Sequence, residues 1–291
     1  MKIINLSLLL SLSVISINGN EKEINKTNFG DLPPEIIGKM KDNLNGKTNL
    51  NSLNKDVRKK FFEAKARSTD KGFIVKLGRK GNKFNKDNDF KSSKVNIKVD
   101  KNYKLDEFVS QLSDFMKYYG KKVDNISVDI SNVDLSNLKD NEISTISKSL
   151  KNVKELDLTN TGITPSLLVT LFKESNSLEN LDLTSVDLSQ LTVEQAELIS
   201  KSLKNVKGLR LYETKIKVSS LVTLLEGFTS LENLNIYNVN LSSLTVEQAK
   251  RFAKSLSNIR NIDLIRTKIN NDTLNLLDEY LPEGAEIGDL N

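Results

Sequence analysis

The feature that most constrains this chain is an internal repeat of 53 residues. Residues 153–205 and 206–258 align without a gap, and 29 of the 53 aligned positions are identical. The segment SLENLDL at 177–183, for example, returns as SLENLNI at 230–236. Self-similarity at a fixed period of this size is typical of proteins built from stacked units that contact mainly their neighbours. We therefore expect most of the chain to form a repeat array.

Each 53-residue unit divides into a shorter and a longer repeat. The steps between related blocks are 25, 28, 25 and 28 residues, and the blocks begin at Val153, Leu178, Val206, Leu231 and Ile259. Counted from these residues, aliphatic side chains occupy positions one, four, six and eleven. The alternation at positions four and six places two aliphatic side chains on one face of a short strand. The sequence between strands predicts one helix in each repeat.

Capping patterns mark where these helices begin. Thr192 and Gln195 fit a capping box, and the same pattern returns at Thr245 and Gln248. Helical spacing after Thr192 predicts one buried face that carries Val193, Ala196, Ile199 and Leu203. One strand and one helix cannot bury their own apolar faces, whereas stacked copies can.

The block pattern L-x-x-L-x-L-x-x-(T/V)-x-(L/I) resembles the leucine-rich repeat, with alternating lengths like those of the ribonuclease-inhibitor type. The resemblance implies an α/β fold, a right-handed solenoid with a parallel concave sheet and convex helices. The family's usual Asn or Cys at position nine is replaced in the short repeats by Thr161, Thr214 and Thr267. Weaker copies, with strands near 95–99, 126–130 and 285–290, extend the array to about seven repeats over residues 95–291.

Residues 1–19 have the pattern of a secretory signal peptide. Lys2 is followed by a short apolar run that ends near the small residues Ser16 and Gly19. The run is too short and too polar for a membrane span. We therefore expect a secreted or exported protein with no membrane span after signal cleavage. A buried N-terminal helix or strand is the alternative.

Residues 20–65 are expected to form a small α-helical domain. A helix begins with prolines and an acid within Asp31–Ile37. The sequence L-P-P-E-I-I, followed by N-L-x-x-L and a basic helix, resembles an F-box. The resemblance implies docking to the Skp adaptor subunit of an SCF-type ubiquitin ligase through Leu32, Pro33, Ile36, Leu50 and Leu53. The alternative is that these helices only cap the first repeat.

Residues 66–94 are poor in apolar side chains and are expected to form a basic linker. The net charge of the chain is +5, and ten Lys or Arg against three Asp fall within residues 71–101. Because nucleic-acid-binding proteins usually spread basic charge over a face, no nucleic-acid partner is expected. The chain contains no Cys and no His. This excludes thiol and His-based catalysis and Cys/His metal sites, so we expect no catalytic residues, no metal and no cofactor.

The variable strand positions are expected to face a protein ligand on the concave side of the solenoid. Position five is acidic in the early repeats, and the late repeats carry tyrosine and arginine at positions five to eight. Tyr and Arg are the residue types most often found as interface hot spots. The predicted contact patch is Arg210, Tyr212, Tyr237, Ile265 and Arg266. A solvated strand surface is the alternative for these residues.

A row of acids at position five is the candidate for acid–base chemistry or cation binding. It consists of Asp129, Asp157 and Asp182. With no His and no further converging ligands, neither an acid–base pair nor a cation site is favoured.

Two functions fit this organisation. The first is a non-enzymatic, exported adaptor that links a host SCF-type ubiquitin ligase to a target held by the repeats. A signal peptide suits such an adaptor if the source is an intracellular bacterium that exports it into a host. The alternative is a secreted or periplasmic leucine-rich-repeat binding protein whose N-terminal helices are only a cap.

Overall fold

The computed structural model describes residues 73–77, 94–99, 103–121 and 123–287. All of these residues belong to the unit of the chain that begins at Thr69. The predicted signal peptide, residues 1–19, and the predicted F-box-like domain, residues 20–65, lie outside the described residues. Both therefore stay predictions.

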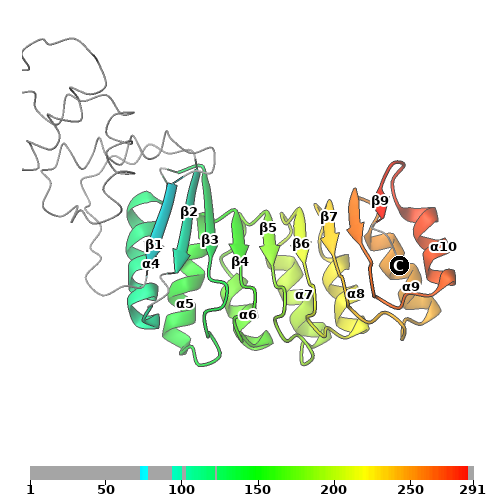
Figure 1. The fold of residues 1–291 in the computed structure, drawn as a ribbon, viewed down its shortest axis with the longest axis horizontal. Coiled ribbons are helices and arrows are strands. Elements are labelled where there is room, and N and C mark those ends of the chain that lie inside the picture. Colours follow the sequence, from blue (N-terminus) through cyan, green and yellow to red (C-terminus); the bar gives the residue numbers. More distant parts are fainter. Residues whose placement is uncertain (1–72, 78–93, 100–102, 122, 288–291) are drawn as a thin grey trace, which may run out of the picture. The chain divides into compact units, whose positions relative to one another are not determined.

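The described strands form one parallel sheet in which each strand pairs with the next along the chain (Figure 1). The register places equivalent positions side by side, so that Leu181 lies between Leu156 and Leu209. The predicted parallel sheet is thus confirmed. Its nine described strands are β1 (Phe73–Leu77), β2 (Lys94–Val99), β3 (Asn125–Asp129), β4 (Glu155–Asp157), β5 (Asn180–Asp182), β6 (Gly208–Arg210), β7 (Asn233–Asn235), β8 (Asn261–Asp263) and β9 (Glu286–Ile287).

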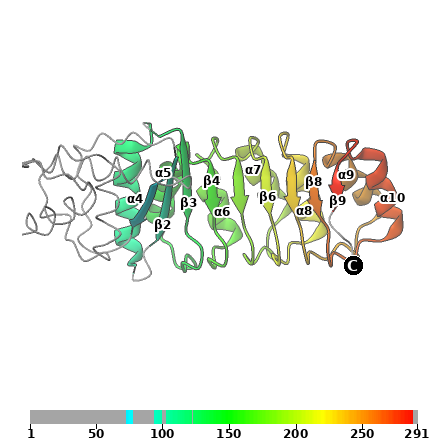
Figure 2. The ribbon, with the colours of Figure 1, turned by 45° about the horizontal axis from the view of Figure 1, so that its top comes forward.

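Helices cover one face of this sheet and leave the other face open (Figures 1 and 2). Each helix packs against the helix of the next repeat. None of the helices in the described ranges is long and apolar enough to cross a membrane. The helices are α4 (Leu105–Tyr119), α5 (Asp140–Ser149), α6 (Pro165–Phe172), α7 (Val193–Ser202), α8 (Val218–Glu226), α9 (Val246–Ser255) and α10 (Asn271–Tyr280), and a 3-10 turn, η3 (Leu150–Asn152), follows α5.

The core lies between the sheet and the helices and consists of the aliphatic residues of the repeat pattern. In the block that begins at Val153, the side chains of Leu156, Leu158 and Ile163 are at most 2% exposed. Phe172 on α6 and Phe252 on α9 are fully buried. Burying one such side chain stabilises the fold by about 1.5–3 kcal/mol. Because every block repeats this burial, stacking the blocks provides the main driving force for folding.

The predicted capping boxes are confirmed at the starts of α7 and α9. The Thr192 hydroxyl accepts the Gln195 N–H at 3.2 Å, and the Gln195 side chain accepts the Thr192 N–H at 3.1 Å. Thr245 and Gln248 make the same pair of bonds. The prediction that Val193 shares the buried face was wrong, because 39% of Val193 is exposed. Helical side chains tilt toward the N-terminus, so a residue at the first position leans past the end of the helix.

At position nine, the short repeats carry threonine in place of the family's usual Asn or Cys, and each threonine hydroxyl makes a hydrogen bond of its own. Thr161, Thr214 and Thr267 are at most 1% exposed. Their hydroxyls donate to the backbone carbonyl three residues earlier, at 2.9, 2.9 and 2.7 Å. A buried hydroxyl with a carbonyl acceptor avoids the desolvation cost of an unpaired polar group. The departure from the family pattern is therefore compatible with a closed turn.

One strand lies inside the range predicted to be a linker. β1 occupies residues 73–77 of the predicted linker 66–94 and pairs with β2. Val75 and Leu77 on β1 are buried and lie opposite Ile97 and Val99. The segment Phe-Ile-Val-Lys-Leu is short and lies among lysines, so the composition did not indicate this strand, which extends the sheet by one strand.

Candidate protein-binding surface

The open face of the sheet is hollowed into a groove of about 1220 Å³. Strands β2 to β9 line it, chiefly through the residues at positions three and five of each block. Most of these side chains are polar or charged, and they include Asp157, Asp182, Arg210, Asn235 and Asp263. A long polar groove of this kind differs from the enclosed, mostly apolar cavities that bind small molecules.

The acids at position five hold the turns that follow the strands. The carboxylates of Asp157 and Asp182 each accept the backbone N–H two residues further on, at 2.8 and 2.9 Å. The same bond is made by Asp129, Asn235 and Asp263. The predicted acidic row is therefore part of the fold, since each side chain satisfies a backbone donor at the end of its strand.

Cross-strand contacts neutralise most of this row. The second carboxylate oxygen of Asp129 lies 2.8 Å from the Lys98 ammonium. Partial burial acts to raise the pKa of Asp129, but hydrogen bonds from Lys98 and Ser131 outweigh it, and the pKa lies below its usual value. At the other end of the row, Asp182 pairs with Arg210 at 3.2 Å. These pairs leave Asp157, between them, as the member without a cationic partner among the described residues.

Three residues at the ends of β6, β7 and β8 form a contiguous group that we call the rim cluster: Tyr212, Tyr237 and Arg266. The two tyrosine rings meet edge to face, with centroids 4.8 Å apart. The Arg266 guanidinium lies 5.5 Å from the centroid of the Tyr237 ring. A hydrogen bond between Tyr212 and Glu213 raises the pKa of the Tyr212 hydroxyl above its usual value of 10.

A backbone ladder brings the rim cluster together. In each turn from β3 to β7, the N–H of position eight donates to the carbonyl of position seven in the next repeat, as Ser185 does to Tyr212 at 2.8 Å and Asn238 to Ile265 at 2.9 Å. This ladder stacks the position-seven side chains of consecutive repeats. Position eight has a positive φ in every turn from β3 to β8: Asn132, Asn160, Ser185, Glu213, Asn238 and Arg266.

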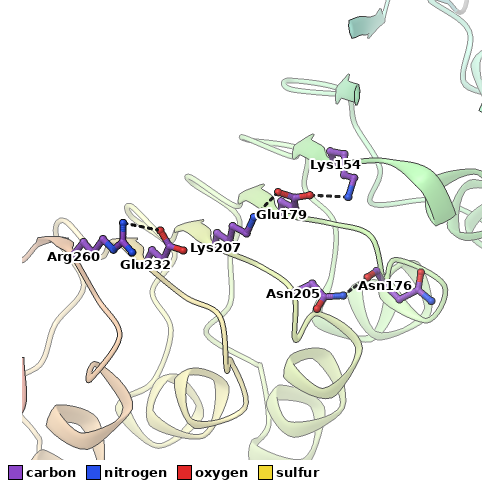
Figure 3. A network of polar contacts seen from close by, with 7 residues as sticks. All are labelled: Lys154, Asn176, Glu179, Asn205, Lys207, Glu232 and Arg260. Carbon is purple, nitrogen blue, oxygen red and sulfur yellow. Dashed lines mark hydrogen bonds and ion pairs between the residues drawn. The ribbon is translucent and has the colours of Figure 1, made fainter. Parts of the chain in front are cut away.

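A second, charged row follows position two, before the strands begin (Figure 3). Position two alternates in sign along five blocks: Lys154, Glu179, Lys207, Glu232 and Arg260. Glu179 contacts Lys154 at 2.7 Å and Lys207 at 3.0 Å, and Glu232 lies 3.8 Å from Arg260. In the loops beside this row, the Asn205 amide donates to the Asn176 carbonyl at 2.7 Å. Sequence reasoning missed this row, although the alternation is legible once the blocks are aligned.

Comparison with known proteins supports the fold. No sequence-family model matches the chain, and no curated protein matches it. Among solved structures, the leucine-rich repeat-containing protein LegL7 from Legionella pneumophila is similar, with a TM-score of 0.50 and 17% identity over 72% of this chain and 70% of LegL7. The described residues have a leucine-rich-repeat fold. A protein from Bacteroides fragilis is more distant, with a TM-score of 0.37, 13% identity and coverage of 69% and 66%.

In this leucine-rich-repeat fold the residues of the predicted contact patch occupy two places. Tyr212, Tyr237 and Arg266 meet in the rim cluster. Arg210 lies in the groove, 67% exposed, and pairs with Asp182. Ile265 precedes Arg266 and is half-buried, and its N–H is held by Asp263. The pairing of Arg210 with Asp182 was not foreseen, because their separation of 28 residues has meaning only when the strands are in register.

Two further predictions concern metal binding and the adaptor contact. Within the described ranges, no group of three or more Asp or Glu residues could hold a metal ion. The predicted adaptor-contact residues lie outside the described part of the chain: Leu32, Pro33, Ile36, Leu50 and Leu53.

Proposed function

We propose that the protein is a non-enzymatic binding protein that holds a protein partner against the open face of its repeats. The observation that carries this proposal is the rim cluster beside the groove. Tyr212 and Tyr237 are half-buried and Arg266 is exposed, so a partner can bury more of all three side chains. Such aromatic and arginine anchors supply most of the binding energy of many interfaces.

The dimensions of the face favour a protein rather than a small ligand. Eight strands line the groove, and neighbouring strands lie about 4.8 Å apart, so the groove runs for roughly 34 Å. A standard interface covers about 800 Å² on each partner. The length and the polar floor of the groove suit an area of that size.

Site-specific photo-cross-linking tests this proposal. A benzophenone amino acid in place of Tyr237 is expected to capture a partner from extracts, whereas the same probe in place of Leu198 should capture none. Leu198 lies on α7, on the helical face, and is 52% exposed. The captured protein, once purified, should bind the full chain, and Tyr212→Ala/Tyr237→Ala should weaken its Kd at least tenfold. Equal capture at both positions would contradict the proposal.

A finer proposal is that residues 20–65 dock the protein to an SCF-type ubiquitin ligase of a host cell after export through the signal peptide at 1–19. The support is the L-P-P-E-I-I sequence followed by Leu50 and Leu53 at the spacing of an F-box. A leucine-rich-repeat unit after such a segment would then hold the target.

A binding assay of residues 20–291 with a purified eukaryotic Skp adaptor tests the docking proposal. We expect binding that disappears in Leu32→Ala/Pro33→Ala/Ile36→Ala and persists in Tyr212→Ala/Tyr237→Ala, because the second variant changes only the repeat unit. A folded protein without affinity for the adaptor would reject it.

The other reading is a secreted or periplasmic binding protein in which residues 20–65 cap the first repeat. Deleting residues 20–65 separates the two readings. Loss of a cap should lower the melting temperature of the repeats, whereas removal of an independent docking domain should leave it unchanged.

A further inference from the structure

The turn after β8 carries two cations, Arg266 of the rim cluster and Lys268. Arg266 and Lys268 are both exposed. Among the described residues, no carboxylate forms an ion pair with either. The equivalent of Lys268 in the preceding short repeat, Lys215, does have a partner, since it lies 3.4 Å from Asp187.

The backbone at both residues is one that arginine and lysine seldom adopt. Arg266 has a φ of 58° and Lys268 a φ of 56°. The equivalent residues of the other turns also have a positive φ: Asn132, Asn160, Ser185, Glu213 and Asn238 at the first position, and Gly162 and Lys215 at the second. The left-handed backbone is therefore a feature of the repeat, and what distinguishes the turn after β8 is that both positions carry a cation. Two exposed cations held two residues apart can bind a ligand of opposite charge.

The rim cluster fixes the orientation of one of these cations. Arg266 packs on Tyr237, and Tyr237 packs edge to face on Tyr212. A guanidinium that contacts an aromatic ring still has N–H donors in its own plane, and their fork matches the two oxygens of a carboxylate. Glu213, the acid at the same turn position two repeats earlier, forms no ion pair with Arg266.

We infer that the partner presents an acidic segment, in which an Asp or Glu carboxylate binds Arg266 and an adjacent apolar side chain packs on Tyr237 and Ile265. This inference rests on the proposed function, since it names the chemistry of the partner at the same surface. Lys268 adds a second positive charge two residues away. The central groove selects against a uniformly acidic ligand, because Asp157 would repel it.

A displayed library of random dodecapeptides, selected on the full chain, tests the inference without knowledge of the natural partner. We expect the selected peptides to contain Asp or Glu beside an apolar residue at least threefold more often than the input. Arg266→Asn should abolish that enrichment. The variant should fold, because Asn132, Asn160 and Asn238 occupy the same turn position. Lys148→Asn, which removes the same charge from an exposed position on α5, is the matched control.

Fluorescence anisotropy with one selected peptide gives the quantitative test. Arg266→Asn in the protein and Asp→Asn in the peptide should each weaken the Kd about tenfold, and the two changes together should cost little more than one alone. Equal weakening by Lys148→Asn would mean unspecific attraction and would overturn the inference. A selection without acidic enrichment, or without any enrichment, would also overturn it.

The two proposals fail in different ways. If selected peptides lose affinity with Tyr212→Ala/Tyr237→Ala but not with Arg266→Asn, the rim cluster binds partners and only the carboxylate inference fails. If none of these substitutions changes the affinity of the selected peptides, the proposed binding surface fails as well.

Discussion

Two buried serines on the helices of the repeat unit differ in a single hydrogen bond. Ser147 on α5 is 3% exposed, and its hydroxyl has no partner within the described ranges. Ser220 on α8 is 1% exposed and donates to the Leu191 carbonyl at 2.6 Å. An unpaired buried hydroxyl costs about 1–3 kcal/mol, whereas a paired one makes a net contribution of about 1 kcal/mol.

We therefore expect Ser147→Ala to raise the free energy of unfolding by about 1 kcal/mol and Ser220→Ala to lower it by about the same amount. Urea denaturation of both variants checks this through the midpoint, with an unchanged slope showing that only stability has moved. Shifts in the same direction would mean that the hydroxyls are not distinguished by their bonds.

Backbone strain gives a second matched pair. Gly162 and Lys268 occupy the same position of short repeats and have φ values of 65° and 56°. A Cβ at Gly162 would meet no atom closer than 3.5 Å, so Gly162→Ala should lose about 1 kcal/mol through backbone conformation alone. Lys268→Gly should gain up to about 1 kcal/mol for the same reason. Thermal and urea denaturation measure both, and a loss in Lys268→Gly would show that Lys268 is held by a contact.

The rim residues show how far a single sequence carries a prediction at this scale. Tyr212 and Tyr237 were predicted to share a face because both occupy position seven, and they meet because the turn ladder stacks that position. The role of Asp157 and Asp182 as turn acceptors was not predictable from spacing, since it depends on the backbone of the turn that follows each strand.

At the level of elements, α7 and α8 approach closely where Gly227 follows α8. A methyl group at Gly227 would overlap the Ser200 side chain of α7. The φ of Gly227 is −83°, which alanine adopts freely, so any loss in Gly227→Ala reports packing rather than backbone strain. We expect a loss of about 1–3 kcal/mol from overpacking, and adding Ser200→Gly should recover part of it. A double-mutant cycle by urea denaturation measures the coupling.

The alternating charges before the strands make the stability depend on acid. Hydrogen bonds from Lys154 and Lys207 lower the pKa of Glu179 below its usual value of 4.5. A lowered pKa stabilises the fold fully above about pH 4.5, and this contribution disappears as pH falls through the folded-state pKa. Glu179→Gln should thus lose a few tenths to about 1 kcal/mol at pH 7 and less at pH 3. Denaturation curves at both pH values, with the exposed pair variant Glu197→Gln as control, check this.

For the whole repeat unit, the pairing of short and long repeats predicts which deletions the chain tolerates. Removing residues 206–258 joins Asn205 to Ile259 and preserves the alternation. We expect this variant to keep one cooperative transition, with about 3–8 kcal/mol less stability at roughly 0.05–0.15 kcal/mol per residue. Removing residues 206–230 instead places Glu179 beside Glu232 and two long repeats together.

That second deletion should broaden or abolish the thermal transition, because like charges and mismatched turns become neighbours. Circular dichroism melting of the two variants compares them directly. If the shorter deletion were the better tolerated, the 53-residue pair would not be the unit of stability.

The architecture was predictable because the leucine pattern recurs in block after block, and the strands β2 to β9 follow that pattern. The strand β1 was not predicted, because its buried residues Val75 and Leu77 lie among lysines and form too short a pattern. The charged row at position two was not predicted for a different reason. Its alternation of sign becomes visible only when the repeats are aligned at a position that the strand pattern leaves variable.

The turn acceptors at position five limit how this surface could diverge. A change there to an apolar or basic residue would remove the acceptor of a backbone N–H, as Arg210 alone does among β3 to β8. Positions three and seven carry no such duty, so they can vary while the turns stay intact. Related proteins that acquire new partners should therefore keep Asp or Asn at position five. Their binding specificity should change through the residues at positions three and seven.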